Sequence, residues 1–178
     1  GAFEYAQAKD TRADTVLAVY DSDGNLVLVG RDSNIIDDQP GTEAGAGRCI
    51  AAQHSQSLEA WFLHVPGILI VAPATPADAK GLLKAAIRSD DLVLFIEHKM
   101  LYGIKGEVPD GDYVLPLGQA AVRREGKDIT VVSYSRMANR CSDVCNKLAA
   151  DGVDAEMIDL RCLNPLDLRT VLASVKKT

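Results

Sequence analysis

Three kinds of side chain in this chain of 178 residues could do chemistry: histidines, cysteines and one cluster of acidic and amide side chains. A histidine exchanges a proton near neutral pH, so His54, His64 and His98 are the candidate acids or bases. Taken alone, each is more simply explained as a structural hydrogen-bonding residue. The choice among the three therefore depends on the residues around them.

The four cysteines, at positions 49, 141, 145 and 162, do not have the spacing of a zinc site. Cys141 and Cys145 are four residues apart, which would place both on one face of a helix. Free cysteine is among the most buried residue types. We therefore interpret the cysteines as core residues of a protein in a reducing compartment.

Asp21, Asp23 and Asn25 have the D-x-D-x-N spacing that opens a calcium-binding loop. Such a loop carries Glu at its twelfth position, where this chain has Asp32. The segment also joins two β-prone runs, at 15–20 and 26–30, as the turn of a hairpin would. A solvated turn is the favoured interpretation, because Asp, Asn and Gly favour turns for local reasons. A cation-binding β module is the alternative.

Composition limits the kinds of partner that we expect. The formal net charge is −6 and the isoelectric point is about 5.0, which argues against binding a polyanion through the overall field. No apolar run is long enough to span a bilayer, and residues 1–5 lack the features of a signal peptide. We therefore expect a cytoplasmic protein with no nucleic-acid and no membrane partner.

The elements that would position these residues alternate between strand and helix from residue 68 onward. Apolar runs at 68–72, 92–96, 129–134 and 155–160 have the length of strands. Two apolar stripes at helical spacing lie between them; their members are Ala79, Leu82, Leu83, Ala86 and Ile87, then Met137, Cys141, Val144, Cys145, Leu148 and Ala149. The pattern predicts an α/β fold of two parallel βαβ units with a β-hairpin at the N-terminus.

Capping residues mark the ends of the predicted helices. Thr75, Pro76 and Asp78 have the order of an N-cap, a first helical residue and the acid of a capping box. Gly152 would end the second helix, and Asp167 closes a segment that would begin a third. The second unit has only two predicted strands, so we expect it to be cut short, or to be completed by another chain or by the first unit.

Six motifs, in order along residues 49–178, resemble one family. They are Ala52-Gln-His-Ser-Gln-Ser-Leu-Glu-Ala-Trp-Phe62, His64-Val-Pro-Gly67, Pro76-Ala-Asp-Ala-Lys-Gly-Leu-Leu83, Glu97-His-Lys-Met-Leu-Tyr102, Val131-Val-Ser-Tyr-Ser-Arg136, and Ile158-Asp-Leu-Arg161 with Asn164-Pro-Leu-Asp167. Together they resemble the β subunit of the E1 component of 2-oxo acid dehydrogenase complexes, the pyruvate, branched-chain and acetoin type within the transketolase-like superfamily.

The resemblance implies a thiamine diphosphate enzyme that transfers an acyl group to a lipoyl group. It implies an E1 α-type partner that holds the diphosphate through magnesium, a lipoyl-bearing E2, and a homo- or hetero-oligomer such as a heterotetramer. It also divides the chain into an acidic hairpin segment at 1–48, part of a pyrimidine-binding domain at 49–118 and part of a transketolase C-terminal-type domain at 119–178.

The resemblance also implies site residues. His54 matches the family's active-site histidine, whereas His64 and His98 match no catalytic position. Glu43 takes the place of the glutamate that protonates the cofactor's aminopyrimidine if Asp38-Gln-Pro-Gly-Thr-Glu-Ala-Gly45 aligns with the family's Asp-Thr-Pro-Ile-Ser-Glu-Ala-Gly segment. The favoured alternative aligns residues 44–48 with the glycine-rich loop before the histidine motif and leaves Glu43 an incidental surface acid.

A structural potassium ion is implied at Ala86, Ser89 and Asp91, where several family members bind one through main-chain oxygens. A simple helix-to-strand turn explains these residues equally well. The family has a much longer segment before its histidine motif than this chain has. We therefore weigh two functions: an E1 β-type subunit or fragment that is inactive alone, and a non-catalytic rearranged remnant that serves as an interaction scaffold.

Overall fold

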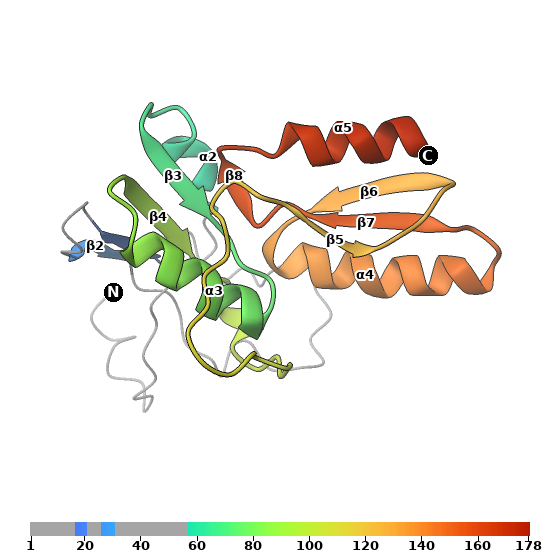
Figure 1. The fold of residues 1–178 in the computed structure, drawn as a ribbon, viewed down its shortest axis with the longest axis horizontal. Coiled ribbons are helices and arrows are strands. Elements are labelled where there is room, and N and C mark those ends of the chain that lie inside the picture. Colours follow the sequence, from blue (N-terminus) through green and yellow to red (C-terminus); the bar gives the residue numbers. More distant parts are fainter. Residues whose placement is uncertain (1–16, 21–25, 31–56) are drawn as a thin grey trace, which may run out of the picture.

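The computed structural model describes residues 17–20, 26–30 and 57–178, which form two mixed sheets with helices packed on them (Figure 1). The first sheet has the order β2-β1-β4-β3-β8. Its strands are β1 (Leu17–Tyr20), β2 (Leu26–Gly30), β3 (Ile68–Val71), β4 (Leu92–Ile96) and β8 (Cys162–Asn164). Strands β3 and β4 are parallel, and the other described pairs are antiparallel. The predicted hairpin of β1 and β2 is confirmed, and it extends the sheet beside β4.

The second sheet has the order β5-β7-β6 and lies between two helices (Figure 1). Its strands are β5 (Ala121–Arg124), β6 (Ile129–Ser133) and β7 (Ala155–Asp159), and its helices are α4 (Ser135–Ala150) and α5 (Leu168–Lys177). Strands β6 and β7 are parallel, as predicted, but β5 runs antiparallel to β7. The third strand thus comes from the same segment of chain, and not from the first unit, which was one of the three alternatives that the sequence left open.

Helix α3 (Pro76–Ile87) makes the crossover between β3 and β4. Its predicted N-cap and first helical residue are confirmed: the Thr75 side chain accepts a hydrogen bond from the Asp78 N–H at 3.1 Å, and Pro76 stands at the first turn. The Asp78 carboxylate, predicted as the acid of a capping box, accepts from the Thr75 hydroxyl and pairs with two arginines. Asp167 caps α5 in the same way, accepting from the Thr170 N–H at 3.0 Å. The short helices α2 (Glu59–Phe62) and η3 (Lys99–Leu101) are not apparent in the sequence pattern.

Two apolar cores stabilise the two sheets. Leu82 and Ala86 of α3 pack against the first sheet, on Val71, Val93, Phe95 and Cys162. Ala138 and Cys145 of α4 pack against the second sheet, on Ala155 and Met157, and Ala74 from the loop after β3 joins them. Ala74 therefore connects the first unit to the core of the second. The expectation of buried cysteines is confirmed for Cys145 and Cys162, and Cys141 is half-buried, while Cys49 lies outside the described residues.

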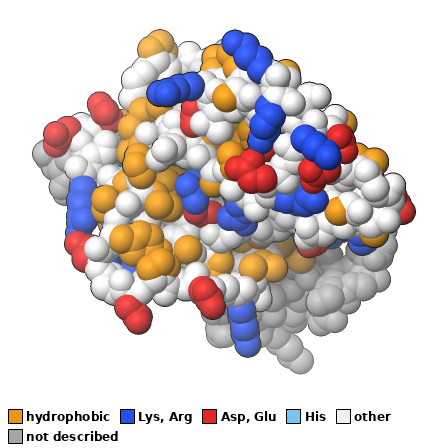
Figure 2. Space-filling model, turned by 45° about the vertical axis from the view of Figure 1, so that its right-hand side comes forward, with side chains coloured by type: hydrophobic (Ala, Val, Ile, Leu, Met, Phe, Trp, Pro, Cys, Tyr) orange, Lys and Arg blue, Asp and Glu red, His pale blue; other side chains and the backbone are white. Residues whose placement is uncertain are grey.

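Parts of the predicted apolar stripes are exposed. The exposed members are Ile87, Met137, Val144 and Ala149, and Leu168, Leu172 and Val175 of α5 are exposed as well. They are exposed because the described part of the chain places no further layer over these helix faces. Figure 2 shows hydrophobic side chains gathered at the left and centre of this view, with charged side chains more frequent at its upper right.

Gly126, between β5 and β6, lies against the backbone of β7. A Cβ at this position would overlap the main chain of Ala155 and Glu156, and the Gly126 N–H donates to Glu156 Oε2 at 3.3 Å. Since β7 is the central strand of its sheet, it has no room to move away. Glycine is therefore required here for close approach.

Gly126→Ala should lower the free energy of unfolding by about 3 kcal/mol, because a methyl group would be forced into fixed backbone. The measurement is urea unfolding followed by circular dichroism. Gly103→Ala is the matched control, since a Cβ at Gly103 meets nothing within 4 Å. Equal stability of the two variants would contradict the packing at Gly126.

Candidate functional site

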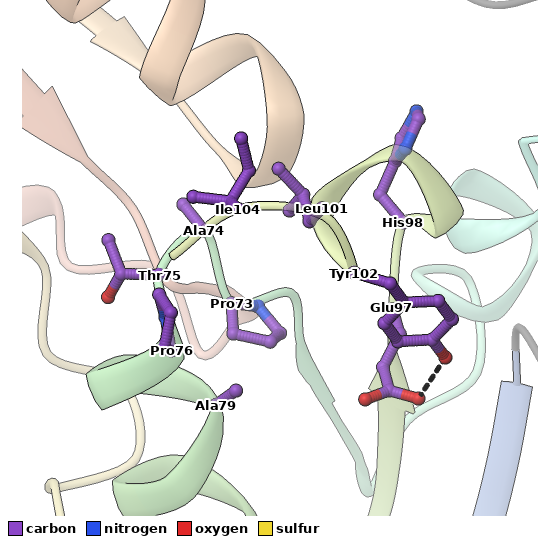
Figure 3. Close-up of a pocket in the computed structure, with 10 residues that line it drawn as sticks. All are labelled: Pro73, Ala74, Thr75, Pro76, Ala79, Glu97, His98, Leu101, Tyr102 and Ile104. Carbon is purple, nitrogen blue, oxygen red and sulfur yellow. Dashed lines mark hydrogen bonds between the residues drawn. The ribbon is translucent and has the colours of Figure 1, made fainter. Parts of the chain in front are cut away.

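A pocket of about 200 Å³ lies where the parallel strands β3 and β4 end (Figure 3). In open α/β sheets, ligands bind outside the carboxyl ends of the strands. One wall is the loop that leads into α3, and the other is the segment after β4. Most of the lining is apolar, from Pro73, Pro76, Ala79, Leu101 and Ile104, and the polar side chains are Thr75, Glu97, His98 and Tyr102.

The polar side chains of the pocket have defined partners. The Tyr102 hydroxyl donates to Glu97 Oε2 at 2.9 Å, and the Thr75 hydroxyl donates to Asp78 Oδ2 at 2.6 Å. His98 Nδ1 accepts from the Met100 N–H at 3.1 Å and so caps η3, and its ring points away from Glu97 (Figure 3). This capping role agrees with the structural interpretation of His98.

A buried ion network lies behind the first turn of α3. Asp78 is 1% exposed, and two arginines neutralise it. Arg161 Nη2 lies 2.6 Å from Asp78 Oδ1, and Arg123 Nη1 lies 3.1 Å from Asp78 Oδ2. Arg123 belongs to β5, and Arg161 follows β7 with a left-handed φ of 58°. The network therefore joins α3 of the first unit to two places in the second.

Asn139 of α4 extends this network to the pocket wall. Its side chain accepts from Arg123 Nη2 at 3.3 Å and donates to the Ala74 carbonyl at 2.8 Å. The Ala72 N–H also donates to the Arg161 carbonyl, at 2.8 Å. The loop that forms one wall of the pocket is thus held in place from the second unit.

Asp159 is the second carboxylate of the network and is fully buried. Its Oδ1 accepts from the Arg161 N–H at 3.1 Å, and its Oδ2 lies 3.8 Å from Arg123 Nη1. Within the described structure, that Oδ2 and Arg161 Nε have no hydrogen-bond partner. Burial raises the pKa of Asp159 to about 6, since it outweighs the opposing charge of Arg123.

The two residues predicted for catalysis and cofactor binding, Glu43 and His54, lie outside the described residues, as do Asp21, Asp23 and Asn25 of the calcium-loop alternative. His64 is described and exposed. Within the described ranges, no group of three or more His, Cys, Asp or Glu side chains could hold a metal ion, and no helix is long and apolar enough to cross a membrane.

The residues predicted to bind potassium form the turn at the end of α3. The Ser89 N–H donates to the Ala86 carbonyl at 3.2 Å, and the Asp91 N–H donates to the Ser89 hydroxyl at 3.2 Å. These hydrogen bonds fully explain a helix-to-strand turn. The Ala86 carbonyl oxygen and the Ser89 hydroxyl oxygen each keep a lone pair that a cation can use. Potassium binding at this turn therefore stays a prediction.

Sequence reasoning identified Asp78 as a capping residue but missed its arginine partners. One signal was available: Asp159 and Arg161 carry opposite charges at the end of an apolar strand, and buried charges are paired. The same signal does not identify Arg123 or Asn139, because their contact with Asp78 depends on how the two sheets pack.

Comparison with known proteins relates the chain to a known group. Residues 40–105 match the family described as the transketolase pyrimidine binding domain, and residues 118–178 match the transketolase C-terminal domain. The chain is 52% identical over 134 residues to the β subunit of the acetoin:2,6-dichlorophenolindophenol oxidoreductase of Cupriavidus necator, covering 75% of this chain and 40% of that one. It is 51% identical over 135 residues to the 2-oxoisovalerate dehydrogenase subunit beta of Bacillus subtilis, covering 75% and 41%.

A third relative, the pyruvate dehydrogenase E1 component subunit beta of Porphyra purpurea, is 46% identical over 159 residues, covering 89% of this chain and 46% of that one. The chain thus spans less than half the length of these curated relatives. Among solved structures, the inactive β4 tetramer of a split-gene transketolase is similar, with a TM-score of 0.58 and 25% identity over 71% of this chain and 41% of that one.

Asp159→Asn should remove a pH dependence of stability between about pH 6 and 4. The pKa of Asp159 rises from its ordinary value of 3.8 to about 6 on folding. The folded chain therefore binds a proton at Asp159 at a higher pH than the unfolded chain does. As the pH falls through this window, the unsubstituted chain should gain about 3 kcal/mol in the free energy of unfolding from this group. Urea unfolding at several pH values measures the effect.

Asp143→Asn is the control, because Asp143 is an exposed residue of α4. This variant should keep the pH profile of the unsubstituted chain. A profile for Asp159→Asn that also stays unchanged would show that the buried carboxylate does not titrate in this range.

Proposed function

Because this chain is a relative of E1 β subunits that includes parts of both transketolase-type domains, we propose that it acts as the β-type subunit of a thiamine diphosphate-dependent 2-oxo acid or acetoin dehydrogenase. The observation that carries the proposal is the pair of domain matches, at 40–105 and 118–178, together with 52% identity to a β subunit over 134 residues. The product would be an acyl group transferred to a lipoyl group.

The proposed chemistry assigns one step to each site residue. Thiamine diphosphate supplies the carbanion chemistry by which a 2-oxo acid loses carbon dioxide. The Glu43 carboxyl group would hydrogen-bond a ring nitrogen of the cofactor's aminopyrimidine. The His54 imidazole would exchange a proton with the lipoyl sulfur during acyl transfer, since its ordinary pKa suits that exchange near pH 7. A carboxyl group and an imidazole are suitable donors and acceptors for these tasks.

The proposed enzyme also needs two protein partners and bound cations. The described residues contain no cluster that could hold a divalent metal, and we assign the diphosphate and its magnesium ion to an E1 α-type subunit in a heterotetramer. A lipoyl-bearing E2 would receive the acyl group. A potassium ion at Ala86, Ser89 and Asp91 would stabilise the turn after α3. The three free cysteines among the described residues suit a reducing, cytoplasmic compartment.

The chain alone is proposed to be inactive. The solved split-gene transketolase of similar fold is an inactive β4 tetramer, which supports a subunit that needs a partner to complete its site. The second candidate is a non-catalytic scaffold that keeps the two α/β units and binds a partner without turnover.

Thiamine diphosphate with magnesium should bind when an E1 α-type subunit is present and should not bind to this chain alone. The reason is that the diphosphate site would lie on the partner. Isothermal titration calorimetry of the mixture and of each component measures the effect. Absence of binding heat with a folded mixture would favour the scaffold.

His54→Ala should lower lipoyl acylation by the assembled enzyme at least a hundredfold, the usual contribution of a positioned acid or base. Acylation of a lipoyl domain, followed by mass spectrometry, is the measurement. His64→Ala is the matched control, because His64 is exposed and matches no catalytic position. Equal activity of the two variants would remove His54 from the mechanism.

A further inference from the structure

We propose that the pocket at the ends of β3 and β4 binds a primary alkylammonium group, with the Glu97 carboxylate as its charge partner. The group could belong to a free alkylamine or to a lysine side chain. The proposal goes beyond the thiamine chemistry above and does not depend on it. Its evidence is the hydrogen bonding of Glu97, the apolar walls and the shortage of free N–H donors at the start of α3.

The charge of Glu97 has no counterpart in the described structure. Its Oε2 accepts from the Tyr102 hydroxyl at 2.9 Å, and no described lysine or arginine forms an ion pair with it. Figure 3 shows the other carboxylate oxygen pointing into the space bounded by Pro73 and Ala79. A carboxylate oxygen that lies beside apolar walls and has no charged partner in the described structure suits a ligand that brings a positively charged donor.

The walls fit an aliphatic stem. The pyrrolidine rings of Pro73 and Pro76, the Ala79 methyl group and the side chains of Leu101 and Ile104 surround a cavity of about 200 Å³. An alkylammonium group buries its methylene groups along apolar surface and keeps its charged head beside a polar partner, as lysine side chains do on protein surfaces.

The hydrogen bond from Tyr102 to one Glu97 oxygen favours ammonium over guanidinium as the ligand. A guanidinium binds a carboxylate best through two parallel hydrogen bonds, which need both oxygens. The Tyr102 hydroxyl already takes one of the two acceptor positions of Oε2 and stands on that side of the carboxylate. An ammonium is a compact charge and needs one oxygen.

The start of α3 offers little to an anion. Pro76 has no N–H and the Asp78 N–H already donates to Thr75 Oγ1 at 3.1 Å, which leaves the Ala77 N–H as the backbone donor of this turn. An anion would also meet the negative charge of Glu97. The charge that the pocket selects is therefore positive.

The pocket is held in shape before any ligand enters. Asn139 fixes the Ala74 carbonyl, and the two proline rings stiffen the loop between β3 and α3. Binding would order few side chains, which favours affinity in a small site.

Titration of n-butylammonium chloride into the full chain, followed by calorimetry, tests the proposal. We expect saturable binding that is about tenfold weaker or absent in Glu97→Gln, because this change removes the charge and keeps the shape. Glu107→Gln is the matched control: Glu107 is exposed and does not line the pocket, and binding should be unchanged. Tyr102→Phe frees the second oxygen and should retain binding.

Two further arms make the outcome decisive. Ala79→Leu should fill the pocket and abolish binding, and it serves as the second variant if Glu97→Gln is unfolded by circular dichroism. Titration with Nα-acetyl-lysine N-methylamide distinguishes the source: binding of this compound indicates a lysine side chain, and binding of n-butylammonium alone indicates a free amine. Equal binding of n-butanol, unchanged binding in Glu97→Gln or Ala79→Leu, or no binding of either ammonium would overturn the proposal.

Discussion

The buried Asp78 carboxylate is the constraint on which the arrangement of the two units depends. An ionised carboxylate that is 1% exposed must be paired, because leaving it uncompensated costs several kcal/mol. Its pairing guanidiniums come from β5 and from the residue after β7. Helix α3 therefore reaches its observed environment only when the second sheet is in place, and the position of the pocket wall follows from the same pairing.

Other contacts across the same boundary reinforce this dependence. The Asn164 side chain donates to the Ile68 carbonyl at 2.6 Å, and the Gly118 N–H donates to Cys162 Sγ at 3.1 Å. Strand β8, which follows the second sheet in sequence, pairs with β3 of the first. Two segments that read as separate βαβ units in the sequence thus share strands, a core residue and a charge network.

Patterns of residues close together in the chain predicted the strands, the helix cap and the hairpin, because these depend on interactions between near neighbours. The apolar runs of β3, β4, β6 and β7, the cap of α3 and the hairpin of β1 and β2 all follow from residues close together in the chain. Strand β5 was not predicted, because Ala121-Val-Arg-Arg124 is half polar and its partner lies over thirty residues away. The exposed helix faces were mistaken for core because an apolar stripe does not reveal whether a second layer covers it.

The residues of the candidate site fall into the same two groups, those that local sequence identifies and those that depend on tertiary packing. His54 and Glu43 were identified through motifs, since neither a single imidazole nor a single carboxylate is distinctive by its chemistry. Glu97 and Tyr102 were quoted within a motif, but their hydrogen bond and the walls around them come from tertiary packing. The pairing of Arg123 with Asp78 likewise joins positions 45 residues apart.

Strand β8 has a consequence for how the chain behaves in a concentrated solution. It forms one border of the first sheet, is three residues long and is followed by Pro165, which has no N–H to offer. Short border strands that end at proline are poor templates for a strand of another molecule. This side of the sheet is thereby protected against the edge-to-edge pairing that leads to aggregates.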